Sequence, residues 1–299
     1  MTDDASDKFE RLVGEIRPKL HRYCARMTGS AVDGEDIVQD ALMKALAALP
    51  NCGVIDNPEG WLFRIVHNTA LDFLRRRAQS PMTQNNEALD MIAAPDFRDQ
   101  DHEVATMSLR TFMRLPALQR SAVILKDVLG HSLEEVASIT GASEGAAKSA
   151  LQRGRVRLRE IAKEPADVSL PMLSDGMRVR LIKYVEGFKA GDFDAVRAML
   201  ADDVKLDLVA KLRKQGKSEV GEYYARYAAS EQWAFGAGVI DGRAAMVVYD
   251  RKISLETPAY FVALDFDGDR VVSIHDFLFA RYAMEGIDFS PLNLAPRFQ

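Results

Sequence analysis

The segment from His131 to Lys163 constrains the fold of this chain more than any other, because it carries the signals of two helices joined by a tight turn. Ser132 and Glu135 have the spacing of a capping box, in which each side chain accepts a hydrogen bond from a backbone N–H at the start of a helix. Gly141 can supply the turn, and Ser143 can cap the second helix. The pattern predicts a helix-turn-helix, a motif typical of DNA binding.

The second of these helices has an apolar face and a basic face. At 3.6 residues per turn, the inward positions are Ala147, Leu151, Gly154, Leu158 and Ile161. Lys and Arg donate to guanine and Gln pairs with adenine, so the opposite face suits the major groove. The candidate DNA-contacting residues there are Lys148, Ser149, Gln152, Arg153 and Arg155. A helical hairpin with a solvated basic face is the alternative.

A second basic face is predicted on the helix that begins at Pro58. Asn57 can cap this helix, and Pro58 suits its first position. Cations beside an aromatic ring suit single-stranded nucleic acid, whose phosphates attract charge and whose bases stack. The candidate residues are Trp61, Arg64, His67, Asn68, Arg75, Arg76 and Arg77. The alternative is a solvated helix end with Trp61 in the core, since arginines at a helix C-terminus also complement the helix dipole.

The helix predicted from Gly34 to Pro50 carries a polar arc opposite its apolar stripe. The stripe consists of Ile37, Ala41, Leu42, Ala45, Leu46 and Leu49. Asp36, Gln39 and Asp40 form the arc. Taken alone, these residues are best explained as solvated surface, because charged side chains on the outer face of a helix are the common case.

In this order, the three elements resemble the extracytoplasmic-function sigma factors, the small two-domain sigma factors of bacterial RNA polymerase. The resemblance rests on the stretches EDIVQDALMKALAALP, NPEGWLFRIVHNTALDFLRRR and the helix-turn-helix segment, and it covers residues 8–163. It implies two all-α domains: a region 2 helical bundle over 1–78 and a region 4 helix-turn-helix over 102–163.

The resemblance also implies partners for each surface. The arc of Asp36, Gln39 and Asp40 would dock on the clamp helices of the polymerase β′ subunit, and the β flap is a second expected contact of the polymerase core. The helix from Pro58 would bind the −10 promoter element, and the helix-turn-helix would read the −35 element. Ala150 stands where the family usually has Arg, so the −35 preference stays open.

Beyond residue 174 the pattern becomes mixed. Asp241-Gly242 and Asp267-Gly268 are strong hairpin signals, because a type I′ turn needs positive φ at both central residues. The expected strands are 231–240, 244–251, 259–266 and 270–280. This order of elements, with the stretch GDFDAVRAMLADDV, resembles the SnoaL-like or NTF2-like cone fold. The resemblance implies a multidomain chain with a third, α+β domain over 175–299.

Cone folds enclose a pocket between their helices and a curved sheet. The candidate pocket residues are Tyr184, Asp207, Tyr227, Trp233, Tyr249 and His275. Asp276 follows His275, but adjacent strand residues point to opposite faces, so the two cannot both line the pocket without a bulge. No catalytic residue is assigned. A small ligand in the pocket and regulation of the sigma domains in cis are expectations for this domain.

Two rival functions differ in class from a sigma factor. One is an enzyme or ligand sensor with its activity in the C-terminal pocket and DNA binding as an appendage. The other is a helix-turn-helix repressor outside the sigma family, which would not require a polar face that docks on β′. A turnover assay on the isolated C-terminal domain would distinguish the first rival from a sigma factor.

Composition limits the remaining possibilities. No apolar run has membrane-spanning length and no signal peptide is recognised, so a cytoplasmic protein without a membrane partner is expected. Cys24 and Cys52 are the two cysteines of the chain, and their spacing suggests neither a metal site nor a cofactor. The segment 79–101 has the composition of a flexible acidic linker, and 164–174 that of a short tether. The sequence identifies no anti-sigma factor.

Overall fold

The computed structural model describes residues 3–79, 104, 107–164, 173–228 and 230–292. The chain divides into two compact units, Met1–Ala166 and Asp167–Gln299, which we treat separately. The division falls within the predicted tether. Most of that tether and of the predicted linker lie outside the described residues, so the predicted domain boundaries stay predictions.

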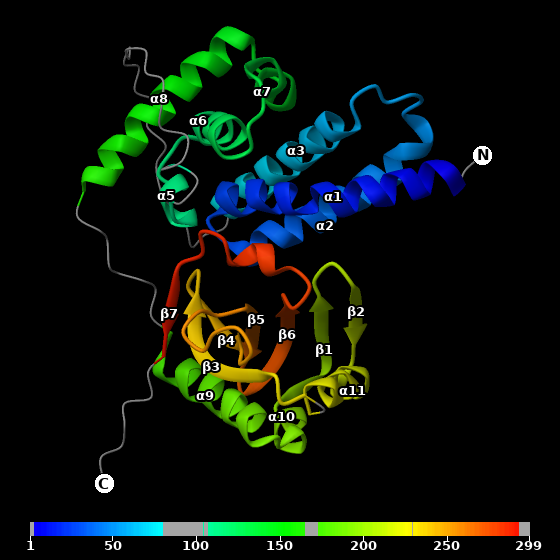
Figure 1. Cartoon of the computed structure of the whole chain (residues 1–299), viewed down its shortest axis with the longest axis vertical. Helices are drawn as coiled ribbons and strands as arrows, with labels where there is room; N and C mark the ends of the chain where they lie inside the picture. Colours follow the sequence, from blue (N-terminus) through cyan, green and yellow to red (C-terminus); the bar gives the residue numbers. More distant parts are fainter. Residues whose placement is uncertain (1–2, 80–103, 105–106, 165–172, 229, 293–299) are drawn as a thin grey trace. The chain divides into compact units, whose positions relative to one another are not determined.

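The first unit is helical (Figure 1). A first bundle consists of α1 (Asp3–Thr28), α2 (Ala31–Ala48), the 3₁₀ turn η1 (Leu49–Asn51) and α3 (Pro58–Gln79). A second bundle consists of α5 (Leu109–Phe112), α6 (Ala117–Val123), the π-helical segment η2 (Ile124–Val128), α7 (Leu133–Thr140) and α8 (Glu144–Lys163). The all-α class predicted for this part of the chain is confirmed.

The predicted helix starts are confirmed by their caps. Asn57 Oδ1 accepts from the Gly60 amide at 2.9 Å. The Ser132 hydroxyl and the Glu135 carboxylate form the capping box of α7. This helix ends at Gly141, whose φ of 69° lies in the left-handed region that favours glycine. Ser143 then caps α8 by accepting from the Ala146 amide at 3.2 Å.

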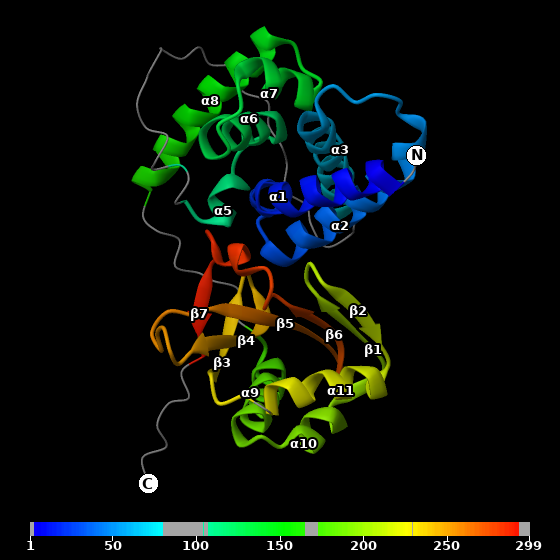
Figure 2. The same cartoon turned by 45° about the vertical axis from the view of Figure 1, so that its right-hand side comes forward.

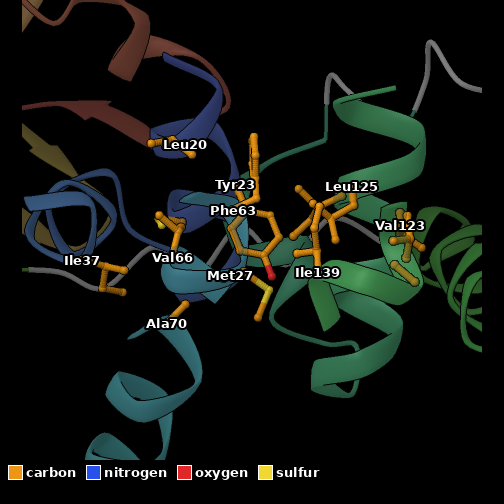
Figure 3. Close-up of a cluster of buried hydrophobic side chains, with 14 of the residues drawn as sticks. Leu20, Tyr23, Met27, Ile37, Phe63, Val66, Ala70, Val123, Leu125 and Ile139 are labelled. Carbon is orange, nitrogen blue, oxygen red and sulfur yellow. The ribbon is translucent and has the colours of Figure 1, made fainter. Parts of the chain in front are cut away.

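One hydrophobic core runs through both bundles (Figure 3). Leu20, Ile37 and Val66 from the first bundle and Val123 and Ile139 from the second belong to this cluster, and all are at most 2% exposed. The inward positions predicted for α8 are also buried. The two bundles therefore bury apolar surface against each other as well as within themselves.

The second unit is an α+β domain, as predicted. Helices α9 (Asp175–Ala190), α10 (Phe193–Ala198) and α11 (Lys217–Ala228) cover one face of a seven-stranded sheet (Figure 2). The strand order is β2-β1-β6-β5-β4-β3-β7. The strands are β1 (Leu200–Leu208), β2 (Leu212–Gln215), β3 (Trp233–Ile240), β4 (Arg243–Asp250), β5 (Tyr260–Asp267), β6 (Arg270–Asp276) and β7 (Phe289–Pro291), and a 3₁₀ turn η3 (Arg281–Met284) precedes β7.

The sheet differs from the expected antiparallel meander in two respects. Strand β1 pairs with β6 in parallel, which makes the sheet mixed. The edge strands β2 and β7 were not predicted, because strands of four and three residues leave little periodicity in the sequence. The four predicted strands are present, although the last ends at Asp276 rather than at residue 280.

The two Asp-Gly hairpins form with different turns. Asp241 and Gly242 have φ values of 50° and 83°, as a type I′ turn requires. In the second hairpin only Gly268 has positive φ, at 53°. The pairing of β5 with β6 shifts register between Asp265 and Phe266, and such an irregularity changes the turn that closes the hairpin.

We predict that Gly34→Ala destabilises the first bundle by about 1–3 kcal/mol. A Cβ at Gly34 would lie 2.6 Å from the Ala25 backbone nitrogen, so α1 and α2 would have to move apart. Urea unfolding measures the effect. The control is Gly145→Ala in α8, where nothing lies within 4 Å and the change should be neutral or stabilising by up to about 1 kcal/mol. Equal stabilities of the two variants would contradict the close helix crossing.

Candidate functional site

The predicted polar arc lies on the outer side of α2. Asp40 is exposed, and Asp36 and Gln39 are half-buried. Met43 and Leu46 beside them are 68% and 44% exposed. Leu46 was predicted in the buried stripe, and this placement is corrected by its exposure. The outer side of α2 therefore combines carboxylates with two large apolar side chains, which is more than a solvated polar face requires.

The basic face predicted on α3 is largely accessible. Trp61 is half-buried, whereas the cations and the amide of this face are exposed: Arg64, Asn68, Arg75, Arg76 and Arg77. Arg75 pairs with Asp72 at 3.2 Å on the same helix. Arg77 pairs at 3.2 Å with Asp33, a buried residue of α2, and so ties the end of α3 to its neighbour.

His67 does not lie on this accessible face. Its side chain is 3% exposed, and its Nδ1 lies 2.6 Å from the Tyr23 hydroxyl. Burial lowers the pKa of His67 to about 4, so the imidazole is neutral at ordinary pH and Nδ1 can accept the Tyr23 proton. The prediction that His67 lies on the exposed basic face is therefore wrong. The sequence of α3 alone could not show that a second side of the helix is also covered.

The recognition face of α8 is divided between exposed and engaged residues. Lys148 and Ser149 are exposed, and Gln152 and Arg153 are half-buried. Arg155 instead binds the carboxylate of Asp127 through two nitrogens, at 2.8 and 2.5 Å. A bidentate pair with a carboxylate that is 1% exposed fixes α8 against η2. Arg155 therefore stabilises the packing of α8 on η2. The prediction that it lies on the DNA-contacting face is corrected.

The interior of the second unit contains a tyrosine–carboxylate network. Tyr223 and Tyr227 of α11 donate to one Asp276 oxygen, at 2.7 and 2.6 Å. Tyr260 donates to the Tyr227 hydroxyl at 3.1 Å, and the Leu278 amide donates to the other Asp276 oxygen at 2.9 Å. Burial raises the pKa of Asp276, although these hydrogen bonds oppose the shift. Each group of this network has a partner within the protein.

The structure divides the six predicted pocket residues between the two faces of the sheet. Tyr184, Tyr227 and Trp233 belong to the cluster between helices and sheet. Asp207, Tyr249 and His275 alternate with residues of that cluster along β1, β4 and β6, so they point to the opposite face. Asp207, Tyr249 and His275 therefore do not line the space between the helices and the sheet, contrary to what the sequence predicted. Of the neighbours His275 and Asp276, it is Asp276 that faces the helices.

A hollow of about 610 Å³ opens at the end of this interior. Its aromatic lining residues are Phe188, Phe193, Tyr227, Trp233 and Phe235. Lys189, Glu231 and Arg251 bring charge to its lining. Sequence reasoning missed Tyr223 and most of this lining. The run YYARY contained a usable signal, because positions 223 and 227 share one face of a helix.

Known proteins match both units. The family model "Sigma-70 region 2" matches residues 12–80, and "Sigma-70, region 4" matches residues 109–158. The ECF RNA polymerase sigma factor SigM of Mycobacterium tuberculosis is 31% identical over 172 residues, which cover 58% of this chain and 82% of SigM. SigG of the same organism is 26% identical over 309 residues, which cover 92% of this chain and 82% of SigG.

Among solved structures, an NTF2-like protein of unknown function from Cytophaga hutchinsonii is similar to 33% of this chain, over 96% of its own length. The identity is 18% and the TM-score is 0.27. Within the described part of the chain, no helix is long and apolar enough to cross a membrane.

We predict that acid destabilises the first unit through His67. The folded chain holds this imidazole neutral down to about pH 4, whereas the unfolded chain protonates it near pH 6.5. Protons therefore favour unfolding in that window, by about 1–2 kcal/mol between pH 7 and pH 5. Urea unfolding at a series of pH values should show a larger loss in the wild type than in His67→Asn, where the pKa of His131, also lowered by burial, still contributes. The same pH dependence in both chains would contradict the assignment.

Proposed function

This chain belongs to the extracytoplasmic-function sigma factors, which direct transcription initiation by RNA polymerase, and we propose how its surfaces divide that task. The order of its three N-terminal elements carries the proposal: an amphipathic helix with an exposed acidic face, a helix with exposed cations, and a capped helix-turn-helix. Polymerase core and promoter DNA follow from the family. The assignments of single residues below are ours.

We propose that the outer face of α2 binds the clamp helices of the polymerase β′ subunit. Asp40 is exposed there, and Met43 and Leu46 expose apolar surface beside it. Protein interfaces combine apolar contact with a polar rim, and this face offers both. Asp36 and Gln39 complete the surface. The β flap of the polymerase is the second contact, made by the second bundle.

The exposed cations of α3 support binding of the −10 element. Arg64 and Arg75 to Arg77 can neutralise phosphates, and the half-buried ring of Trp61 can stack on an unpaired base once it is uncovered. Asn68 adds an amide that can hydrogen-bond to a base. His67 could contact DNA only if the residues that bury its side chain moved away.

The exposed part of α8 supports reading of the −35 element. Lys148 and Ser149 lie in the N-terminal half of the helix, which is the part that contacts base edges in helix-turn-helix proteins. Gln152 and Arg153 follow on the same side. Arg155 contributes by holding α8 on η2, since its guanidinium already binds Asp127.

For the second unit we propose regulation of the sigma domains in cis, with a small ligand in the hollow as the signal. Its aromatic walls and the charges of Lys189 and Arg251 are suited to a small organic molecule. An enzyme in this pocket is the alternative. The Tyr223–Asp276–Tyr227 network favours a structural role, because its hydroxyls and its carboxylate are already hydrogen-bonded to one another. We expect the protein to act in the cytoplasm, with the polymerase.

We predict that Lys148→Ala weakens binding to a −35 duplex by about 1–3 kcal/mol and leaves folding unchanged. Arg155→Ala should instead lower the free energy of unfolding by about 2–4 kcal/mol, because it strands the buried carboxylate of Asp127. DNA titration and urea unfolding of both variants separate the two roles. Unchanged stability of Arg155→Ala together with a loss of DNA affinity would reverse the assignment.

We predict that a chain truncated after Lys163 gives more promoter-specific transcription with core polymerase than the full chain. A tethered domain acts at high effective concentration, so even a weak restraint would be felt by the sigma domains. Run-off transcription at equal protein concentration measures the effect. Lower activity of a folded truncated chain would assign the domain a supporting role, and equal activity would contradict regulation in cis.

A further inference from the structure

The hollow of the second unit lies where two helices meet the start of a strand. Phe188 comes from the end of α9, Phe193 begins α10 and Trp233 begins β3. Helix α9 lies against β3 and beside α10 (Figure 1). The volume of about 610 Å³ is within the range of small-molecule sites, about 300–1,000 Å³. The hollow is therefore large enough for a small organic ligand.

Aromatic rings that pack edge to face form the wall of the hollow. The Phe188 ring lies 5.6 Å from Tyr227 and 5.4 Å from Phe235, measured between ring centroids. Tyr227 and Phe235 are 5.9 Å apart. Phe188 and Tyr227 are at most 6% exposed, whereas Phe193, Trp233 and Phe235 are half-buried. These rings hold one another in place and leave part of their surface open, so a flat ring system could bury a large area against them.

The Tyr227 hydroxyl cannot donate to a ligand without giving up a partner. Its proton bonds to Asp276 at 2.6 Å, and it accepts from Tyr260 at 3.1 Å. Asp276 in turn accepts from Tyr223 and from the Leu278 amide. Polar groups taken out of water cost free energy unless new hydrogen bonds replace the old ones. The part of a ligand that reaches this wall should therefore be apolar.

Arg251 brings a charged group to the rim of the hollow, where it is exposed. Its Nε donates to the Trp233 carbonyl at 3.1 Å, which holds the guanidinium beside β3. The carboxylate of the neighbouring Asp250 bonds instead to the Gln232 side chain, at 2.8 Å, and to the Lys252 amide, at 3.0 Å. Among the described residues no carboxylate pairs with Arg251, so its two terminal nitrogens can donate to a ligand. This fork matches the two oxygens of a carboxylate.

The other charges near the hollow also favour an anionic ligand. Lys189 belongs to the lining, but its Nζ already binds a glutamate of the same helix at 2.9 Å. The Arg281 guanidinium lies 5.9 Å from the centroid of the Trp233 ring and adds positive charge at this wall. Glu231 is an exposed carboxylate of the lining, so water and salt weaken its repulsion of a bound anion. Arg251 is thus the group best placed to bind the charge of a ligand.

We propose that the hollow binds an aromatic carboxylate, with its flat ring system against Phe188, Trp233 and Phe235 and its carboxylate on the guanidinium of Arg251. The proposal rests on the proposed function, which assigns a small ligand to this hollow, and it specifies the chemical class of that ligand. Ring packing supplies most of the buried area. The charge selects acids over neutral molecules of the same shape.

Calorimetric titration of the full chain with 2-naphthoate tests the proposal. Two comparison compounds each lack one of the proposed contacts: 2-naphthylmethanol has the ring system without the charge, and decanoate has the charge without the rings. We expect 2-naphthoate to bind about tenfold more tightly than either compound. Equal affinity for 2-naphthylmethanol would overturn the anionic class, and equal affinity for decanoate would overturn the aromatic class.

Arg251→Gln removes the charge that the carboxylate would bind. We expect it to weaken the binding of 2-naphthoate about tenfold and to leave 2-naphthylmethanol unchanged. The matched control is Lys252→Gln, which removes an exposed charge at the next position, outside the lining, and should change neither affinity. Circular dichroism verifies folding of both variants. An equal loss for the two compounds in Arg251→Gln, or no loss for 2-naphthoate, would overturn the proposal.

Trp233→Leu removes one ring from the wall. We expect it to weaken both naphthyl compounds about fivefold, because both use the ring surface. Unchanged affinities in a folded variant would contradict binding in this hollow. If neither naphthyl compound binds the folded wild-type chain at millimolar concentration, the proposed ligand class is wrong. Transcription by the chain truncated after Lys163 tests regulation in cis separately, so failure of the ligand class and failure of the proposed function are distinguishable.

Discussion

The hydrogen bond from the buried Arg120 guanidinium to the last turn of α1 is the interaction on which the arrangement of the first unit depends. A cation removed from water requires acceptors, and here they come from Met27 in one bundle and Leu115 in the other. The position of the second bundle follows from that requirement. The packing of Phe63 on His131 and the contact of Tyr23 with Ser121 then extend the interface along α1 and α3.

This interface relates the fold to the function. The cations of α3 and the residues Lys148 and Ser149 of α8 stay exposed when the bundles pack together, so their charge can attract DNA.

The sequence predicted those features that arise from local chemistry. The capping box of Ser132 and Glu135, the left-handed Gly141 and the hairpin at Asp241-Gly242 each follow from a few neighbouring residues. The positions of His67, Arg155 and Asp276 could not be predicted in this way. His67 contacts Tyr23, which lies 44 residues earlier in the chain, and Arg155 pairs with Asp127, which lies 28 residues earlier. Which of His275 and Asp276 faces the helices depends on strand register. Local signals thus identified the elements, while tertiary contacts decided which side chains are free to act.

The distance between the two bundles in solution tests the central claim most directly. Spin labels at Glu10→Cys in α1 and Glu160→Cys in α8 occupy exposed positions outside the proposed binding surfaces, in a chain that also carries Cys52→Ser. Pulsed electron paramagnetic resonance should give one narrow distance distribution for the free chain. In Arg120→Met the distribution should broaden, because the buried cation that joins the second bundle to the end of α1 is lost. A broad distribution for the wild-type chain, or the same narrow distribution in Arg120→Met, would contradict the account.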